Sequence, residues 1–381
     1  MQRRQFIKYA ISASAGALVL PELWSSPARA RGKGSNVVLV PDTIAADGSI
    51  DVTGALASFI ASVADGSTIR FPVGGSYRIE ETLRVAHRNN LAFDGNDSTL
   101  FATTSGSGHG DANRSHLKFV GGSQITVTSL NITGANPTPG VYSKAYNSQH
   151  GILLAGVKGA VVTGCTISNV YGDSVYLGSE VPGRVNSPCE DIQVLQNIAT
   201  GNGRQAMTVC YGRNVWFVGN TIDNSGLTIF DFEPNTIHTP CSGIHVIGNT
   251  VGTHGAVFLA AKGGAPVNDV TVSNNTSQIE PLGIQAGHAH RRQSGWVVQG
   301  NVSPVSGNSS RYYGFTNMDD ITVTGNSIVV PDSAVRINDC ATVRVTDNVF
   351  TGASTALDVL RPGDRFYQGP SSHYMARNNT L

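Results

Sequence analysis

The sequence predicts an all-β solenoid, in which short parallel strands stack turn upon turn. Glycine accounts for 44 of 381 residues and charged residues for only 14%, a composition unlike that of coiled coils or disordered chains. Short apolar runs recur at a fixed distance before an asparagine, and successive asparagines are 22 to 29 residues apart. A period of that size is typical of proteins built from stacked structural repeats.

Seven asparagines mark the repeat, each five residues after the first apolar residue of a run. They are Asn197, Asn220, Asn249, Asn275, Asn301, Asn326 and Asn348, and Cys165 and Leu130 occupy the same place in two earlier runs. Equivalent residues of stacked strands lie about 4.8 Å apart. Amide side chains in such a row can therefore hydrogen-bond along the coil, and we assign these asparagines a structural role.

A second set of β-type segments lies between these runs, bounded by Gly, Asn, Ser and Asp residues. Its members are residues 152–155, 175–178, 205–210, 229–233, 256–261, 283–286, 313–316, 334–337 and 356–360. Each turn of the chain therefore supplies at least two short strands. The unequal intervals between turns indicate loops inserted at the corners of a constant rung.

The start of the repeat region has its own pattern. Residues 51–65 carry a helical stripe of Leu56, Phe59, Ile60 and Val63. Gly-Ser-Thr-Ile-Arg-Phe-Pro at 66–72 and Tyr-Arg-Ile at 77–79 follow. These features, with the repeat, resemble right-handed parallel β-helix proteins of the pectate-lyase-like superfamily.

The resemblance covers residues 37–360. It implies a single-stranded right-handed parallel β-helix with a short N-terminal capping helix, within a domain of residues 31–381. Rungs are expected from about 66 to 360 and a C-terminal cap from about 361 to 381. The resemblance is specific for fold only, because this fold hosts lyases, hydrolases, epimerases and phage tailspikes.

Residues 1–30 predict an export signal. Arg3 and Arg4 precede a mild apolar run, and Ala-Arg-Ala at 28–30 provides a cleavage site. This pattern resembles a bacterial twin-arginine signal, with a Sec signal as the alternative, and both predict a periplasmic or secreted protein. Removal of the leader takes away four of 26 basic and one of 26 acidic residues, leaving 22 and 25. The resulting net charge of −3 gives no support to a nucleic-acid partner, and no other stretch is apolar enough to predict membrane insertion.

Five cysteines follow the leader. Cys189 and Cys241 are separated by one rung, which exceeds ordinary disulfide reach, whereas Cys210 lies between them. Both one disulfide and none are compatible with this spacing. No Cys or His spacing indicates a zinc site, and we predict no resident metal.

Two carboxylates on one strand are the leading catalytic candidates. If Phe230 and Phe232 point into the core, Asp231 and Glu233 point outward, because strand side chains alternate. Such a pair can share acid and base work.

Further candidates lie on neighbouring turns of the same stripe. Arg204 and Asp173 complete the catalytic set, with Asp173 as a third carboxylate. The candidate substrate-binding residues are Tyr176, Gln205, Thr208, Phe258, Lys262, Gln285 and His288. Aromatic rings in this stripe are expected to stack on sugars, and the polar groups to bind hydroxyls or carboxylates. The stripe spans about 20 Å, which suits a long polymer.

Two short motifs bear on this site. Gly-Arg-Gln-Ala-Met at 203–207 and Asp-Phe-Glu-Pro-Asn at 231–235 resemble a pairing in some uncharacterised β-helix proteins, where RQG-I precedes D-x-EPN. Here Ala206 replaces the glycine. Gly-His-Gly at 108–110 resembles a polygalacturonase motif, but the Asn-Thr-Asp that belongs with it is absent, so we assign His109 to a loop.

Several candidates have plainer interpretations. Arg204 could only neutralise Asp231 in a structural ion pair, and Asp173 could form an Asx turn at a corner. Lys262 could be a solvated loop residue, and His288 an ordinary surface histidine.

Three functions fit these residues. The leading hypothesis is a glycoside hydrolase that uses Asp231 and Glu233, and it needs no cofactor. The second is a lyase acting on uronate-containing polysaccharides, with Lys262, Arg204 or a histidine as base. In that case Asp231 and Glu233 would hold Ca²⁺ or neutralise the uronate carboxylate through arginine. The third is a non-catalytic glycan-binding surface protein. All three have a polysaccharide or oligosaccharide as partner.

Overall fold

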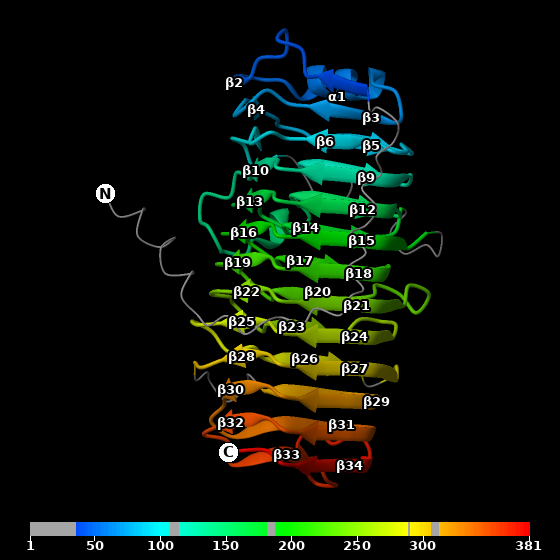
Figure 1. The fold of residues 1–381 in the computed structure, drawn as a ribbon, viewed down its shortest axis with the longest axis vertical. Coiled ribbons are helices and arrows are strands. Elements are labelled where there is room, and N and C mark those ends of the chain that lie inside the picture. The colour runs from blue at the N-terminus through cyan, green and yellow to red at the C-terminus, as the bar shows by residue number, and fades with distance from the viewer. Residues whose placement is uncertain (1–35, 107–113, 181–186, 289, 306–311) are drawn as a thin grey trace, which may run out of the picture. The chain divides into compact units, whose positions relative to one another are not determined.

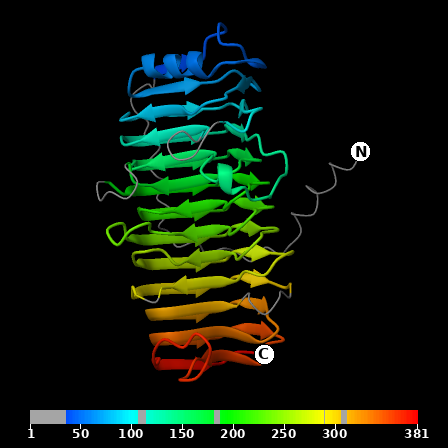
Figure 2. The ribbon, with the colours of Figure 1, turned by 180° about the vertical axis from the view of Figure 1, so that it is seen from behind.

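The computed structural model describes residues 36–106, 114–180, 187–288, 290–305 and 312–381 (Figure 1). Residues 36–381 form an elongated coil of stacked rungs in which the strand pairs are parallel (Figures 1 and 2). The predicted leader and His109 lie outside the described residues. No helix in the described ranges is long and apolar enough to cross a membrane.

The strands fall into three columns that run along the coil. The first column contains β5 (Leu83–Ala86), β8 (Leu117–Val120), β11 (Ile152–Ala155), β14 (Val175–Gly178), β17 (Met207–Val209), β20 (Phe230–Phe232), β23 (Leu259–Ala261), β26 (Ile284–Gly287) and β33 (Thr355–Val359).

The second column carries the strands that precede the ladder asparagines. It contains β1 (Asn36–Leu39), β3 (Ser67–Arg70), β6 (Ala92–Asp94), β9 (Ser123–Thr128), β12 (Lys158–Thr163), β15 (Cys189–Leu195), β18 (Gly212–Val218), β21 (Cys241–Ile247), β24 (Val267–Ser273), β27 (Gln293–Gln299) and β34 (Ser372–Arg377). Two long strands, β29 (Tyr313–Thr324) and β31 (Ser333–Thr346), run through both columns and join them into one sheet.

The third column forms a separate twelve-stranded sheet. It contains β2 (Asp47–Asp51), β4 (Ser76–Arg78), β7 (Thr99–Phe101), β10 (Asn131–Thr133), β13 (Thr166–Ser168), β16 (Ile198–Thr200), β19 (Thr221–Asp223), β22 (Thr250–Val251), β25 (Thr276–Ser277), β28 (Val302–Ser303), β30 (Ser327–Val329) and β32 (Val349–Thr351). A complete rung therefore has three strands, one more than the minimum inferred from the sequence.

The seven predicted asparagines stack in one row, as expected, and each is at most 1% exposed. The backbone N–H and Nδ2 of each donate to Oδ1 of the next at 2.9–3.1 Å, and Asn379 extends the row as an eighth member. The row begins where the N–H of Cys165 donates to Asn197. These bonds satisfy buried backbone groups at a bend where strand pairing lapses.

The residue before each of these asparagines turns the corner between the second and third columns. It has φ between 53° and 64° in the left-handed region, and is Gly in four rungs and Gln, Asn or Asp in the others. Gly, Asn and Asp adopt this conformation at lower cost than other residues. This explains the recurring Gly-Asn and Asn-Asn pairs in the sequence.

The single α-helix of the described residues is α1 (Thr53–Ser62), within the predicted range 51–65. It buries Leu56 and Ile60 against the end of the core, and the Asp51 carboxylate accepts the N–H of Thr53 at 2.9 Å. At the other end, β34 pairs with β31, so strand pairing continues within the segment expected to form a cap. All five cysteines are buried free thiols, which leaves no disulfide among them.

Candidate functional site

The outward face of the first column carries a row of polar side chains. Strand register places Tyr176, Thr208, Asp231, Ala260 and Gln285 side by side on successive strands. Their inward neighbours on β17 and β20, including Phe230 and Phe232, are fully buried. Phe230 and Phe232 belong to the hydrophobic core, as predicted.

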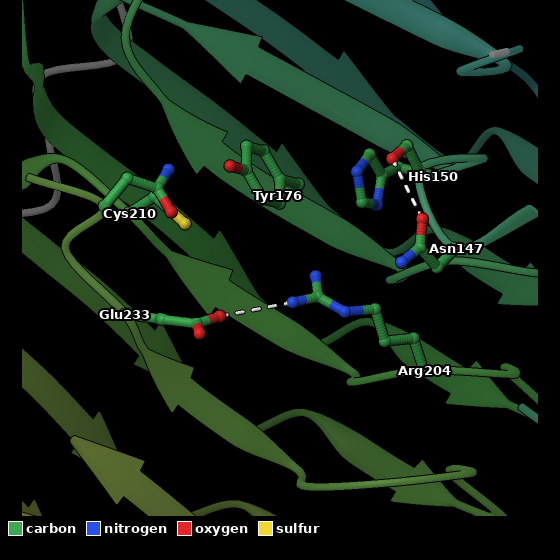
Figure 3. Close-up of a pocket in the computed structure, with 8 residues that line it drawn as sticks. Asn147, His150, Tyr176, Arg204, Cys210 and Glu233 are labelled. Carbon is green, nitrogen blue, oxygen red and sulfur yellow. Dashed lines mark hydrogen bonds and ion pairs between the residues drawn. The ribbon is translucent and has the colours of Figure 1, made fainter. Parts of the chain in front are cut away.

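Arg204 links two carboxylates, one from each of the rungs on either side of its own. Its Nη1 lies 2.9 Å from Asp173 Oδ2 and its Nη2 lies 3.2 Å from Glu233 Oε2 (Figure 3). Burial disfavours the charged guanidinium, but the carboxylates of Asp173, Asp231 and Glu233 outweigh this effect and raise the pKa of Arg204. Arg204 is thus held as a cation whose fork is occupied at both ends.

Asp173 is fully buried below Arg204. Besides the ion pair, its Oδ1 accepts the backbone N–H of Gln205 at 3.0 Å. These bonds to the next rung replace the Asx turn that was the plainer interpretation of this residue.

Asp231 was expected to face solvent, and this expectation was wrong. It points outward from β20 but is only 8% exposed, and the Nε2 of Gln205, which is itself buried, donates to its Oδ2 at 2.7 Å. Burial raises the pKa of Asp231 to about 7, and the neighbouring charge of Glu233 adds to the shift against the opposing effect of Arg204. A carboxyl with this pKa can donate a proton near neutral pH.

A pocket of about 180 Å³ opens beside these groups. Its lining residues are Asn147, Ser148, His150, Tyr176, Arg204, Cys210, Glu233 and Asn235. In Figure 3, Glu233 and Arg204 point toward each other, and Tyr176 and His150 lie beside them. Asp231 lies outside this lining, so the pocket presents Glu233 directly.

His150 is a pocket residue that sequence reasoning missed. Its buried ring stacks on Tyr176 with centroids 4.5 Å apart, and its Nδ1 accepts the backbone N–H of Asp173 at 3.0 Å. Burial lowers the pKa of His150 to about 4, so the ring is neutral at physiological pH. A signal was present, because aligning Ile152 with Val175 places His150 in register with Asp173.

Comparisons with known proteins show the fold. No family model and no curated protein matches the chain. Among solved structures, the catalytic unit of a GH87 α-1,3-glucanase from Streptomyces thermodiastaticus is similar, with 14% identity and a TM-score of 0.56 over 91% of this chain and 70% of that one. The Streptococcus pneumoniae adhesin PfbA is 13% identical, with a TM-score of 0.58 over 91% and 99%. An exopolygalacturonase from Thermotoga maritima is 12% identical, with a TM-score of 0.54 over 87% and 93%.

The chain is a right-handed parallel β-helix. The pocket lies on one outer face of this β-helix. Its residues come from the first column and from the corner loops at either end of that column.

Two predicted binding residues do not face the β-helix surface. Phe258 is fully buried and packs edge-to-face on Phe230 at 5.4 Å, which corrects its assignment to the groove. It precedes β23 at a corner, where two consecutive side chains turn inward and the alternation fails. Thr208 lies in the outward row as expected but is 0% exposed, and its Oγ1 has no hydrogen-bond partner.

The remaining candidates lie farther along the β-helix. Lys262 is exposed and donates to Gln285 Oε1 at 2.5 Å, and partial burial lowers its pKa. His288 is half-buried, and its Nδ1 accepts the N–H of His290 at 3.3 Å. None of these residues lines the pocket. Within the described ranges, no group of three or more His, Cys, Asp or Glu side chains is arranged to hold a metal ion.

Proposed function

We propose that this β-helix is an exported enzyme that hydrolyses glycosidic bonds in a polysaccharide. The observation that carries the proposal is the raised pKa of Asp231, about 7, beside the exposed carboxylate of Glu233. A carboxyl group with a raised pKa beside a second carboxyl group is an arrangement that glycoside hydrolysis can use. The similar fold of a glucanase and an exopolygalacturonase is compatible with this chemistry.

In this mechanism Asp231 is the general acid. It transfers its proton to the glycosidic oxygen as the bond between that oxygen and the anomeric carbon breaks. Glu233 is the general base and takes a proton from the water whose oxygen bonds to the anomeric carbon. Exchange with solvent then returns both groups to their starting forms.

Arg204 holds two carboxylates of the site in position. Because it bonds Asp173 and Glu233 at once, it fixes the Glu233 carboxylate against the pocket. Gln205 holds Asp231 in the same way from the preceding rung. Fixed carboxylates lose little freedom at the transition state, which favours catalysis.

One observation supports elimination as a second candidate. Partial burial lowers the pKa of Lys262, which makes its amine easier to deprotonate for the removal of the proton beside a uronate carboxylate. Lys262, like Asp231, lies outside the lining of the pocket. Arg204 is unsuited to be a base because its pKa is raised. A glycan-binding protein without catalysis is the third candidate, and it resembles the surface adhesin in fold.

A screen of neutral and acidic polysaccharides, with products weighed by mass spectrometry, separates these candidates. Hydrolysis adds one water per cut, whereas elimination yields unsaturated uronates that absorb ultraviolet light. We expect water addition, lost in Asp231→Asn and Glu233→Gln and retained in Lys262→Met. Absorbing products lost in Lys262→Met would establish the lyase, and binding without any product would leave only the third candidate.

A further inference from the structure

We infer that the pocket beside Glu233 is a subsite for an uncharged sugar unit, recognised through its hydroxyl groups and not through a carboxylate. The inference rests on the proposed glycan activity and specifies its substrate class.

The first step is the charge of the pocket. Among the described residues, Arg204 is the only Lys or Arg that lines the pocket, and both ends of its fork are bonded to protein carboxylates at 2.9 and 3.2 Å. Capture of a uronate by arginine requires a free fork. A sugar carboxylate would have to displace Glu233 and would then lie among two like charges opposed by one cation, which is unfavourable at distances of a few ångströms.

The second step is the character of the other lining groups. Asn147, Ser148 and Asn235 carry neutral side chains that both donate and accept hydrogen bonds. Sugar hydroxyls also do both, so these groups match a neutral sugar.

The third step concerns His150. The backbone N–H of Asp173 donates to Nδ1 at 3.0 Å, so Nδ1 must carry a lone pair. The Oδ2 of Asp173 lies 3.6 Å from Nδ1, which is too far to accept a hydrogen bond from a protonated Nδ1. The proton of the neutral ring is therefore on Nε2, the tautomer assigned from this bond. His150 lines the pocket, and its remaining polar ring atom is a donor suited to a hydroxyl oxygen.

The test compares matched polymers that differ only in the carboxyl group. Polygalacturonate and alginate, and the same polymers after chemical reduction of their carboxyl groups, are titrated into Asp231→Asn by calorimetry. We expect the reduced member of at least one pair to bind about tenfold more tightly than its native form. Equal or tighter binding of the native polymers, or failure of every reduced polymer to bind, would overturn the inference.

Two substitutions isolate the cause. Glu233→Gln removes one carboxylate and frees half of the Arg204 fork, so it should shift the preference toward the native polymer by about tenfold, in a salt-dependent way. His150→Asn keeps an acceptor for the Asp173 N–H but removes the Nε2 donor, and should weaken binding of the reduced polymer up to about tenfold. His150→Gln, which restores an N–H near that position, is the matched control. The inference would be contradicted if Glu233→Gln kept the wild-type preference between reduced and native polymers and His150→Asn kept the wild-type affinity for the reduced polymer.

These results are independent of the proposed chemistry. If the reduced polymers bind but the wild-type protein does not cut them, the hydrolase proposal fails and the subsite stands. If uronate polymers are hydrolysed, the hydrolase stands and the neutral subsite fails.

Discussion

Replacement of Asp231 by asparagine should make the protein more stable and less active. The carboxyl pKa rises from 3.8 to about 7 on folding. The folded state therefore holds this proton more tightly than the unfolded chain, and the free energy of unfolding falls as pH rises from about 4 to about 7. A shift of about three units corresponds to about 4 kcal/mol, since each unit is worth about 1.4 kcal/mol.

Asparagine stays neutral at every pH and retains an acceptor oxygen for the Nε2 of Gln205. The stability of Asp231→Asn relative to wild type should therefore increase between pH 4 and pH 8, by up to about 4 kcal/mol. Turnover on a cleaved polymer should fall about 10²-fold, the usual weight of a general acid. Denaturant titrations at pH 4, 6 and 8 measure the first effect, and initial rates measure the second.

Thr208→Val is the matched control, because Thr208 neighbours Asp231 in the same row and its buried Oγ1 has no partner. This change should stabilise the protein by about 1 kcal/mol at all three pH values. A difference between Asp231→Asn and wild type that is the same at pH 4 and pH 8 would refute the titration of Asp231 in this range.

Four further outcomes are expected. Asn275→Ala should lower the free energy of unfolding by about 3 kcal/mol, because two buried donors of the preceding rung lose their acceptor. Asn379→Ala, at the end of the row, should cost only about 1 kcal/mol. Equal costs of the two changes in denaturant titrations would argue against the asparagine row as a source of stability. Arg204→Gln should move the alkaline limit of activity to higher pH, because the guanidinium lowers the pKa of the acid, and an unshifted pH–rate profile would disprove this coupling. A thiol reagent should label the five cysteines slowly in the native protein and completely in denaturant, and fewer than five labels would reveal a disulfide. Replacement of Arg3 and Arg4 by lysine should block export, and unchanged secretion would point to the Sec route.

The repeat made the fold predictable because the same corner conformation, and hence the same residue types, recur in successive rungs. From Asn197 onward, each of these corners has a left-handed residue followed by an asparagine, so the interval pattern identifies the rungs directly. Alternation then assigned Phe230 and Phe232 correctly to the core, whereas Asp231, expected to face solvent, is buried. The third strand of each rung escaped notice, because two or three residues are too short to show a period.

The site was less predictable, because its residues come from corners where no period holds. Phe258 precedes a strand and turns inward with Leu259, so counting along the strand gave the wrong side. His150 and Asn147 belong to the irregular connection between β10 and β11, and their approach to Asp173 depends on how that connection folds. The burial of Asp231 under Gln205 depends on side-chain packing between rungs, which linear patterns do not report.

The asparagine row has a direction. From Asn197 to Asn348, the backbone N–H and the Nδ2 of each asparagine donate to Oδ1 of the C-terminal neighbour, so each Oδ1 accepts from the N-terminal side. The N–H of Cys165 begins the series. The two ends of the row are therefore chemically distinct, because one ends in a donor and the other in an acceptor. A strand appended beyond Asn379 would have to offer a side-chain oxygen at the same point to continue the series. A turn inserted between Asn197 and Asn379 would therefore have to bring both a donor and a side-chain oxygen at this corner to keep the series unbroken.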